Sequence, residues 1–323
     1  MFRDRREFVQ LGLGIFAALS LPLALRRRFT LVRRTIPLMG TIAELQVVDR
    51  DERLGEAAID AALAELLWVE RRMTRFRPDS DIGRANLSAA REAVPVHPAT
   101  AAVVAAALRW AEASEGAFDP GIGAASELWD VINRREPPLA GRVQRLAGRG
   151  FWRKVVVEAP PHQAVLRYDD PDLQLDLGGI AKGYGIDRAA EALRSRGVRH
   201  AIITVGGDLI ALGGAPDGEP WRVGIRSPHD SDALARTLEV RDRAVATSGD
   251  YEQFFEWRGV RFHHLIDPTT AAPRRTAVHS VTVLAGSCLD ADAAATAVFG
   301  LPRVDAVRIA RRLVPEVEVI PLT

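Results

Sequence analysis

The spacing of apolar and polar positions along the chain predicts both strands and helices. Residues 42–48 alternate between the two kinds, as a half-buried strand does. In residues 54–73 the apolar positions recur every three or four residues, which indicates an amphipathic helix. Residues 98–114 predict a second helix, because Pro98 stands in its first turn and Gly116 follows its end.

The rest of the chain mixes strands and helices without a regular strand–helix–strand rhythm. Further strands are expected at residues 154–158, 164–168, 173–177, 200–205, 221–226, 237–240, 260–266, 280–284 and 317–320, and further helices at 186–196, 290–299 and 304–313. This arrangement is typical of the α+β class. We find no clear linker that would divide residues 35–323.

Residues 1–34 differ from this body. Arg5 and Arg6 precede an apolar run from Leu11 to Leu25, which is short for a membrane span, and more arginines follow it. Basic residues before a short apolar stretch indicate an export signal, and the arginine pair indicates the twin-arginine type. Basic clusters at both ends also fit an uncleaved anchor. We therefore expect export to the periplasm, with residues 1–34 either as a signal or as an anchor in the inner membrane.

Composition narrows the classes of function. The 323 residues include 43 basic and 42 acidic ones, and residues 1–34 alone hold eight arginines against two acids. The remainder therefore has a slight acidic excess, which disfavours nucleic-acid binding, because that needs a basic surface. The single cysteine, Cys288, excludes an internal disulfide framework. Since Lys154 and Lys182 are the only lysines, a lysine inside a glycine-rich loop is informative.

The first candidate for chemistry is the segment Asp176-Leu-Gly-Gly-Ile-Ala-Lys182-Gly. A predicted strand leads into the glycines and then into a helix, so backbone N–H groups and the helix dipole converge and favour a bound phosphate. Lys182 would add a full positive charge. The segment matches neither the P-loop nor the dinucleotide fingerprint. A glycine turn that only caps a helix remains the alternative.

A second candidate lies in the predicted helix 290–299. Asp292 and Thr296 are four residues apart and share a face, so a carboxylate and a hydroxyl can reach one ion. Ligands that are all oxygen suit Mg²⁺, which also keeps water and substrate phosphates around it. The alternative is a capping residue and an ordinary helix surface.

Three further segments combine polar residues with turns. His264-Leu-Ile-Asp267-Pro268 places a histidine near a carboxylate, which is either a structural pair or a means of carrying a proton. The segments 116–120 (Gly-Ala-Phe-Asp-Pro) and 247–251 (Thr-Ser-Gly-Asp-Tyr) fit plain turns when each is taken alone.

In order along the chain, these segments resemble the FAD:protein FMN transferase family, known as the ApbE family. The matching segments are 39–41, 73–81 with Asn86, 116–120, 176–187, 206–208, 248–249, 264–268 and 291–296. Each is weak alone, but the ordered set is specific. The resemblance implies an α+β fold of ApbE-like, T-fold-like architecture, with mixed sheets and packed helices in a single compact catalytic unit over residues 35–323.

The resemblance also implies a reaction. FAD is bound, Mg²⁺ clamps its diphosphate, and a threonine hydroxyl of a target flavoprotein attacks the FMN-side phosphorus. AMP leaves, and FMN stays attached to the target through a phosphoester. A metal at a diphosphate neutralises charge and promotes in-line displacement, so this chemistry fits the oxygen ligands in the sequence.

Individual residues acquire roles by the same resemblance. Asp292 and Thr296 correspond to side-chain ligands of the metal, and backbone oxygens near Gly179 and Ala295 would complete the site. Either His264 or Asp267 would handle the threonine proton. The positions that correspond to FAD contacts are Met39, Phe76, Ala117, Phe118, Asp119, Asp176, Lys182 and Ile266.

Two positions depart from the family pattern. Phe76 stands where tyrosine is usual, which keeps a ring for stacking but removes a phenolic hydrogen bond. Ala271 stands where glycine is usual. If this position takes a positive φ, alanine costs about 1 kcal/mol.

Two other functions remain open. An FAD-binding module without transferase activity would keep Phe76, Phe118 and Asp176 but could dispense with a metal site. A Mg²⁺-dependent FAD diphosphatase would use water in place of threonine and release FMN and AMP. The presence of Asp292 and Thr296 favours an enzyme over a binding module.

The arginine pair gives the first prediction. Replacing Arg5 and Arg6 by lysine should trap the full-length protein in the cytoplasm, because the twin-arginine route depends on the pair itself. Cell fractionation followed by immunoblotting measures this. Normal export of the double variant would contradict the twin-arginine interpretation.

Overall fold

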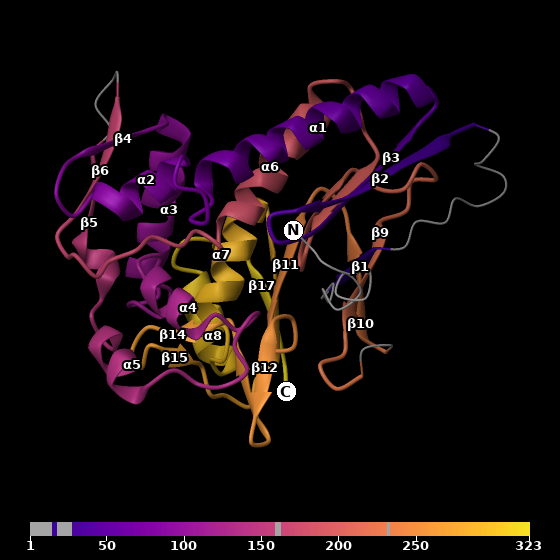
Figure 1. The fold of residues 1–323 in the computed structure, drawn as a ribbon. Helices are drawn as coiled ribbons and strands as arrows, with labels where there is room; N and C mark the ends of the chain where they lie inside the picture. The colour runs from indigo at the N-terminus through magenta and orange to yellow at the C-terminus, as the bar shows by residue number, and fades with distance from the viewer. Residues whose placement is uncertain (1–14, 18–27, 159–162, 231–232) are drawn as a thin grey trace.

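A seven-stranded sheet forms the centre of the computed structural model, which describes residues 15–17, 28–158, 163–230 and 233–323 (Figure 1). The strands follow the order β17-β16-β11-β8-β7-β3-β2, and every neighbouring pair is antiparallel. Their bounds are β2 Thr30–Leu38, β3 Thr41–Asp49, β7 Ala201–Val205, β8 Asp208–Leu212, β11 Ala244–Gly249, β16 Ser280–Ala285 and β17 Glu318–Leu322.

Both faces of this sheet are covered, so β7, β8, β11 and β16 are buried along their whole length. Helices α1 (Glu52–Met73), α6 (Ala181–Arg194) and α7 (Cys288–Val298) form a layer on one face (Figure 1). On the other face lies a small sheet with the order β1-β9-β10, of strands Ile15–Ala17, Trp221–Arg226 and Leu234–Val240. Its apolar side chains, such as Trp221 and Val223, pack against Ile202 and Leu209 of the main sheet.

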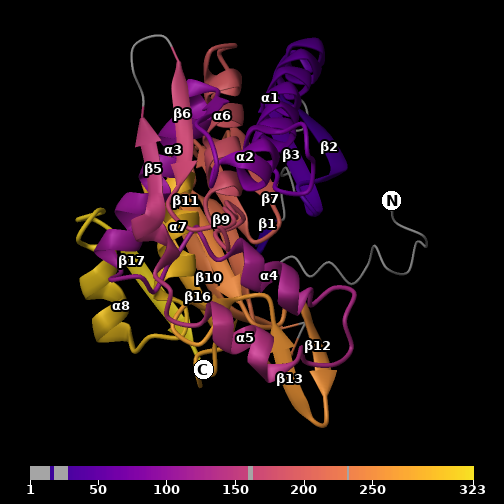
Figure 2. The same ribbon diagram turned by 60° about the vertical axis from the view of Figure 1, so that its left-hand side comes forward.

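A second group of elements lies beyond α7 and borders the site. It consists of α2 (Asp81–Ser88), α3 (Pro98–Ala113), α4 (Gly123–Trp129), α5 (Ala140–Leu146), a 3₁₀ turn (Phe151–Lys154) and a sheet of β4 (Val94–Val96), β6 (Ala164–Tyr168) and β5 (Val155–Glu158). The hairpin of β12 (Phe254–Trp257) and β13 (Val260–His263) projects beside α4 and α5 (Figure 2). The short pair β14 (Ile266–Asp267) and β15 (Ala272–Pro273) and helix α8 (Arg303–Ala310) complete the chain.

The α+β class expected from the sequence is confirmed, but two expectations around the glycine-rich loop are wrong. Residues 173–177 form no named strand, because their partners are not a neighbouring strand. The amide of Asp176 donates to the Pro120 carbonyl (2.8 Å), and the side chain of Asn86 pairs with both backbone groups of Leu175. Helix α6 begins at Ala181 and not at residue 186, so Lys182 lies in its first turn.

Most of the apolar run Leu11–Leu25 lies outside the described residues, apart from β1. Strand β2 begins at Thr30 and pairs with β3 over its full length, so the sheet includes residues 30–34. In the part of the chain that is described, no helix is long and apolar enough to cross a membrane.

Ala271 does take a left-handed conformation, with φ of 53°, and its side chain is fully buried. Changing it to glycine would relieve about 1 kcal/mol of backbone strain but would remove a buried methyl group worth about 0.8 kcal/mol. We predict that Ala271→Gly leaves the free energy of unfolding within about 1 kcal/mol of wild type. Ala271→Val, which adds both strain and bulk, should cost about 2 kcal/mol or more. Urea denaturation measures the free energy of unfolding of both variants. A strongly stabilised Ala271→Gly variant would show that the relieved strain is larger than the lost burial.

Candidate active site

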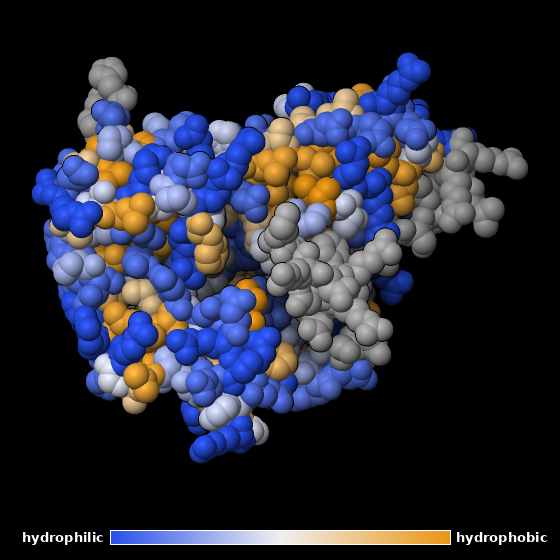
Figure 3. Space-filling view, in the orientation of Figure 1, coloured by the Kyte–Doolittle hydropathy of each residue, from blue (hydrophilic) through white to orange (hydrophobic). Residues whose placement is uncertain are grey.

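A cavity of about 1060 Å³ opens between the central sheet with its helices and the second group of elements. Figure 3 shows the surface hollowed there, with polar side chains prevailing around the opening. Segments from across the chain line it: 39–41, 69–77, 117–119, 126–133, 176–182, 206–207, 247–253, 264–268 and 292–299, with Ile122 and Arg274. Within these ranges only some residues face the cavity.

An ion cluster lies at the inner end of the cavity. Lys182 Nζ is 2.8 Å from Asp208 Oδ2, 3.1 Å from Asp292 Oδ1 and 3.3 Å from the Gly178 carbonyl oxygen. The other carboxylate oxygen of Asp292 accepts the backbone N–H of Gly183 at 3.0 Å. The three charged residues come from α6, β8 and α7, so the cluster fixes these elements together. The ammonium group of Lys182 thus directs its N–H donors at oxygen atoms of the protein itself.

The cluster contains more acid than base. Burial disfavours the charged form of Lys182, but Asp208 and Asp292 outweigh this and raise its pKa. Burial, together with the nearby Asp292, raises the pKa of Asp208 to about 7. Glu252 lines the cavity, and burial and Asp208 raise its pKa to about 8; its Oε1 is buried without a hydrogen-bond partner among the described residues. Two carboxylates therefore contact one ammonium group, and a third carboxyl group, that of Glu252, lies nearby and is mostly protonated at neutral pH.

Gly179 and Thr296 meet beside this cluster. A Cβ added to Gly179 would lie 2.8 Å from Thr296 Oγ1 and 3.2 Å from the ring of Phe118, so a side chain here would fill the space in front of the hydroxyl. Gly179, Thr296 and Asp292 all line the cavity. Ala295 is buried in α7 and its side chain does not line it.

The mouth of the cavity carries an aromatic ring and an arginine. Phe76 is 79% exposed, and the guanidinium carbon of Arg75 lies 4.3 Å from its ring centre. Arg75 Nε is 3.0 Å from Asp176 Oδ2, while the other oxygen of Asp176 accepts the amide of Gly178 at 2.9 Å. The Arg75–Asp176 pair therefore ties the loop that carries Phe76 to the glycine-rich segment.

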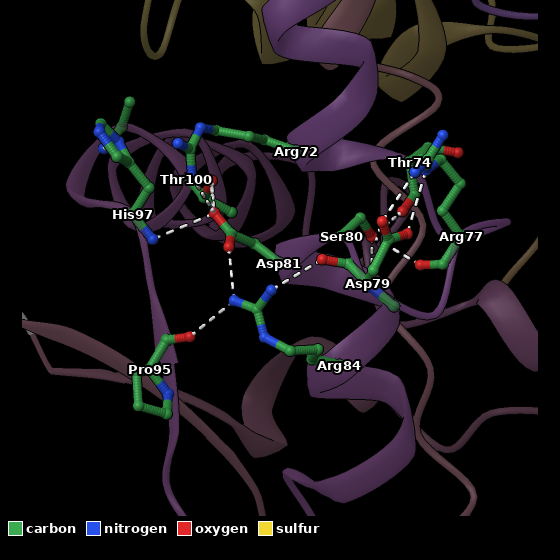
Figure 4. Close-up of polar contacts among 12 residues, drawn as sticks. Arg72, Thr74, Arg77, Asp79, Ser80, Asp81, Arg84, Pro95, His97 and Thr100 are labelled. Carbon is green, nitrogen blue, oxygen red and sulfur yellow. Dashed lines mark hydrogen bonds and ion pairs between the residues drawn. The ribbon is translucent and has the colours of Figure 1, made fainter.

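A buried carboxylate anchors the base of this loop (Figure 4). Asp81 accepts the backbone N–H of His97 at 3.0 Å and the hydroxyl of Thr100 at 2.7 Å, both at the start of α3. Arg84 holds its other oxygen at 2.7 Å. Ser80 precedes it, caps α2 and reaches back to the Thr74 carbonyl at 2.5 Å. These contacts close residues 74–80 into a fixed turn.

The turn after α3 forms another wall. Asp119 is buried, and burial raises its pKa to about 6 although the amide of Gly121 donates to it at 2.8 Å. Arg274 donates to the carbonyl oxygens of Ala117 (3.1 Å) and Phe299 (2.6 Å). A cationic side chain from the far end of the chain thus fixes the turn that presents Ala117 and Phe118.

The two candidates for proton handling lie in different surroundings. His264 lines the cavity, and burial together with the neighbouring His263 lowers its pKa to about 4. Its Nδ1 faces the Gln253 carbonyl oxygen at 3.4 Å. Asp267 does not line the cavity: it accepts the amide of Thr269 at 2.8 Å and lies 3.8 Å from Arg274. The geometry therefore separates a group that faces the cavity from one that shapes a turn.

Most residues singled out in the sequence converge on this one cavity. Those whose side chains or backbone line it are Met39, Phe76, Ala117, Phe118, Asp119, Asp176, Gly179, Lys182, His264, Ile266, Asp292 and Thr296. Ala295 and Asp267 do not. Sequence reasoning assigned no role to Arg75, Asp208 or Glu252. Asp208 lay in a noted Gly-Gly-Asp motif, but nothing in the sequence indicated that Glu252 is buried beside it.

Comparisons with known proteins agree with this geometry. The sequence profile of the ApbE family matches residues 39–321. A Vibrio cholerae protein named FAD:protein FMN transferase is 35% identical over 269 residues, 80% of this chain and 78% of the relative. A protein of the same name from Treponema pallidum is 36% identical over 283 residues, covering 82% and 77%.

Solved structures show the same fold. The flavin transferase ApbE from Vibrio cholerae superposes with a TM-score of 0.77 at 31% identity, covering 91% of this chain and 93% of that one. The ApbE protein from Thermotoga maritima gives 0.79 at 26% identity, covering 90% and 94%. The compact α+β architecture and the ordered motifs thus have one explanation, and the chain belongs to the ApbE family.

Proposed function

We propose that this protein is a Mg²⁺-dependent FAD:protein FMN transferase, which moves the FMN part of FAD to a threonine hydroxyl of a target flavoprotein and releases AMP. The observation that carries the proposal is the convergence of the family's motif residues on one cavity. The names of the relatives from Vibrio cholerae and Treponema pallidum support the same activity.

The cavity suits a dinucleotide. Its volume of about 1060 Å³ is at the upper end of small-molecule sites. The exposed ring of Phe76 offers a face for an aromatic ring system at the mouth. The ion cluster of Lys182, Asp208 and Asp292 lies among backbone segments from α6, β8 and α7. A ligand with a flat ring at one end and charge in its middle matches this division.

The oxygen groups around Asp292 fit a magnesium ion. Asp292 and Thr296 both line the cavity, and Gly179 leaves the space in front of the Thr296 hydroxyl open. Among the described residues, no three His, Cys, Asp or Glu side chains are arranged to hold a metal. Mg²⁺ needs no such group, because it binds through one or two carboxylates, water and substrate phosphates. We propose these residues as its ligands, with backbone oxygens near Gly179 and Ala295.

The chain's own residues supply positioning and proton transfer. Bound Mg²⁺ would neutralise charge on the diphosphate and act as a Lewis acid there. Lys182 contacts the carboxylate of Asp292 at 3.1 Å and so restrains its position. His264 is uncharged at neutral pH because its pKa is lowered. In the tautomer whose Nδ1 proton is directed at the Gln253 carbonyl, Nε2 can accept the proton of the attacking threonine hydroxyl.

The location of the reaction is part of the proposal. The arginine pair and apolar run in residues 1–34 support export to the periplasm, with the leader either removed or kept as an anchor in the inner membrane. Such a protein would meet its FAD and its acceptor flavoprotein outside the cytoplasm.

Asp292→Ala should abolish transfer, because it removes the proposed carboxylate ligand while Lys182 keeps Asp208 as its partner. The assay is flavin fluorescence of an acceptor domain in a denaturing gel after incubation with FAD and Mg²⁺. Asp170→Ala is the matched control, since Asp170 is an equally buried acid, paired with Arg149 and Lys154 away from the cavity. Retained labelling in Asp292→Ala would refute the metal role. Release of free FMN and AMP by wild type, with no labelled acceptor, would indicate a diphosphatase instead.

The lowered pKa of His264 makes stability depend on pH. The unfolded state takes up a proton near pH 6.5, but folded His264 does so only near pH 4, so lowering the pH through this window favours unfolding. We predict that wild type loses more stability than His264→Gln between pH 7 and pH 5. Urea denaturation of both proteins at the two pH values measures this. Equal losses of stability in the two proteins would contradict the lowered pKa of His264 in the folded state.

A further inference from the structure

Helices α6 and α7 approach each other unusually closely at their N-terminal ends. A Cβ added to Gly183 would lie 2.2 Å from the carbonyl oxygen of Cys288 and 2.8 Å from the Cα of Leu289. The two backbones therefore touch where α6 carries Lys182 and α7 carries Asp292 one turn further on. Small changes in how the two helices meet would alter the relative positions of these residues.

Two carboxylates, one from each helix, accept hydrogen bonds across this junction. Asp292 of α7 accepts the amide of Gly183 in α6 at 3.0 Å. Asp187 of α6 accepts the amides of Cys288 and Leu289, the first two residues of α7, at 2.8 and 2.9 Å. Each helix thus offers a carboxylate to free amides at the start of the other, where the helix dipole favours negative charge.

Asp187 is not the ordinary cap of α7. Ser287 supplies that cap, because its hydroxyl accepts the amide of Asp290 at 3.1 Å. Asp187 also does not line the cavity, and burial raises its pKa to about 6 although both amides oppose this. Asp187 therefore touches neither the cavity nor the proposed metal. It uses both carboxylate oxygens to hold helix α7, which carries the proposed ligands.

We infer that Asp187 is a positioning residue, which locks α7 to α6 so that Asp292 and Thr296 face Gly179 and the cavity. The inference rests on the proposed function, because it assigns Asp187 to the alignment of the proposed magnesium ligands. Groups that orient metal ligands typically affect metal affinity about 10–100-fold. Asp187 does so through the two backbone amides of α7, and not by contact with the reacting atoms.

The test compares Asp187→Asn with Ser287→Ala. Both remove a capping interaction from the first turn of α7, but only Asp187→Asn disturbs the bond between the helices. We expect the Mg²⁺ concentration for half-maximal effect to rise about 10-fold or more in Asp187→Asn and to stay near wild type in Ser287→Ala. Two readouts are needed: the Mg²⁺-dependent rise in Tm without FAD, and the Mg²⁺ dependence of transfer.

A second variant keeps the test decisive if Asp187→Asn does not fold. Gly183→Ala pushes the same helices apart from the other side, so it should also raise the Mg²⁺ requirement. Equal Mg²⁺ requirements in Asp187→Asn and Ser287→Ala would overturn the inference, as would a normal requirement in Gly183→Ala. If wild type itself shows neither a Mg²⁺-dependent Tm nor transfer, the proposed function fails, which is a separate result.

Discussion

The site depends on the contact between one partly buried ammonium group and two buried carboxylates. Lys182 lies between Asp208 and Asp292, and each of the three comes from a different element. Taking an ion out of water costs several kcal/mol, which is offset only when geometry is good and each group has partners. For Lys182 this holds, because the Gly178 carbonyl accepts its remaining contact. Removing a partner from such a cluster typically costs about 3–5 kcal/mol, so the elements cannot drift apart freely.

The close packing of backbone around the cluster follows from this requirement. Charged groups 3 Å apart bring their helices together, and only glycine leaves room at Gly183, where α6 meets α7, and at Gly179, where the loop passes Thr296 and Phe118. The glycines of this segment therefore do two things. They let helices touch, and they keep the space in front of a hydroxyl free for a ligand.

The sequence predicted the periodic elements well and the irregular ones poorly. Strand β6 and helices α1 and α3 were expected within two residues of their bounds, because each buries one regular face. The segment 173–177 has the apolar pattern of a strand, but the side chain of Asn86 and the turn around Pro120 take the place of strand neighbours. The periodicity of apolar residues indicates which residues are buried, but it does not indicate which groups their backbones hydrogen-bond with.

In the candidate site, too, local features were predictable and contacts between distant segments were not. Ordered motifs located its glycines, Lys182, Asp292 and His264, because local chemistry and spacing are visible in a sequence. Glu252 and the role of Asp187 were not visible, since each depends on a contact between segments that are distant along the chain. The sequence also treated Asp267 as equivalent to His264, and only the fold separates the cavity-facing histidine from the turn-forming carboxylate.

The charge balance of the cluster explains why the proposed substrate would need a cation. A diphosphate is anionic, and Asp292 and Glu252 line the cavity together with Lys182, which also contacts Asp208. The pKa of Glu252 is raised to about 8, so this group is mostly protonated at neutral pH, and the negative charge of the cluster belongs to Asp292 and in part to Asp208. Lys182 has no donor to spare, because its contacts already go to Asp208, Asp292 and Gly178. Like charges at this depth repel strongly, since little water screens them. A divalent cation held by Asp292 and Thr296 would reverse the sign of the interaction, so metal and FAD would each favour binding of the other.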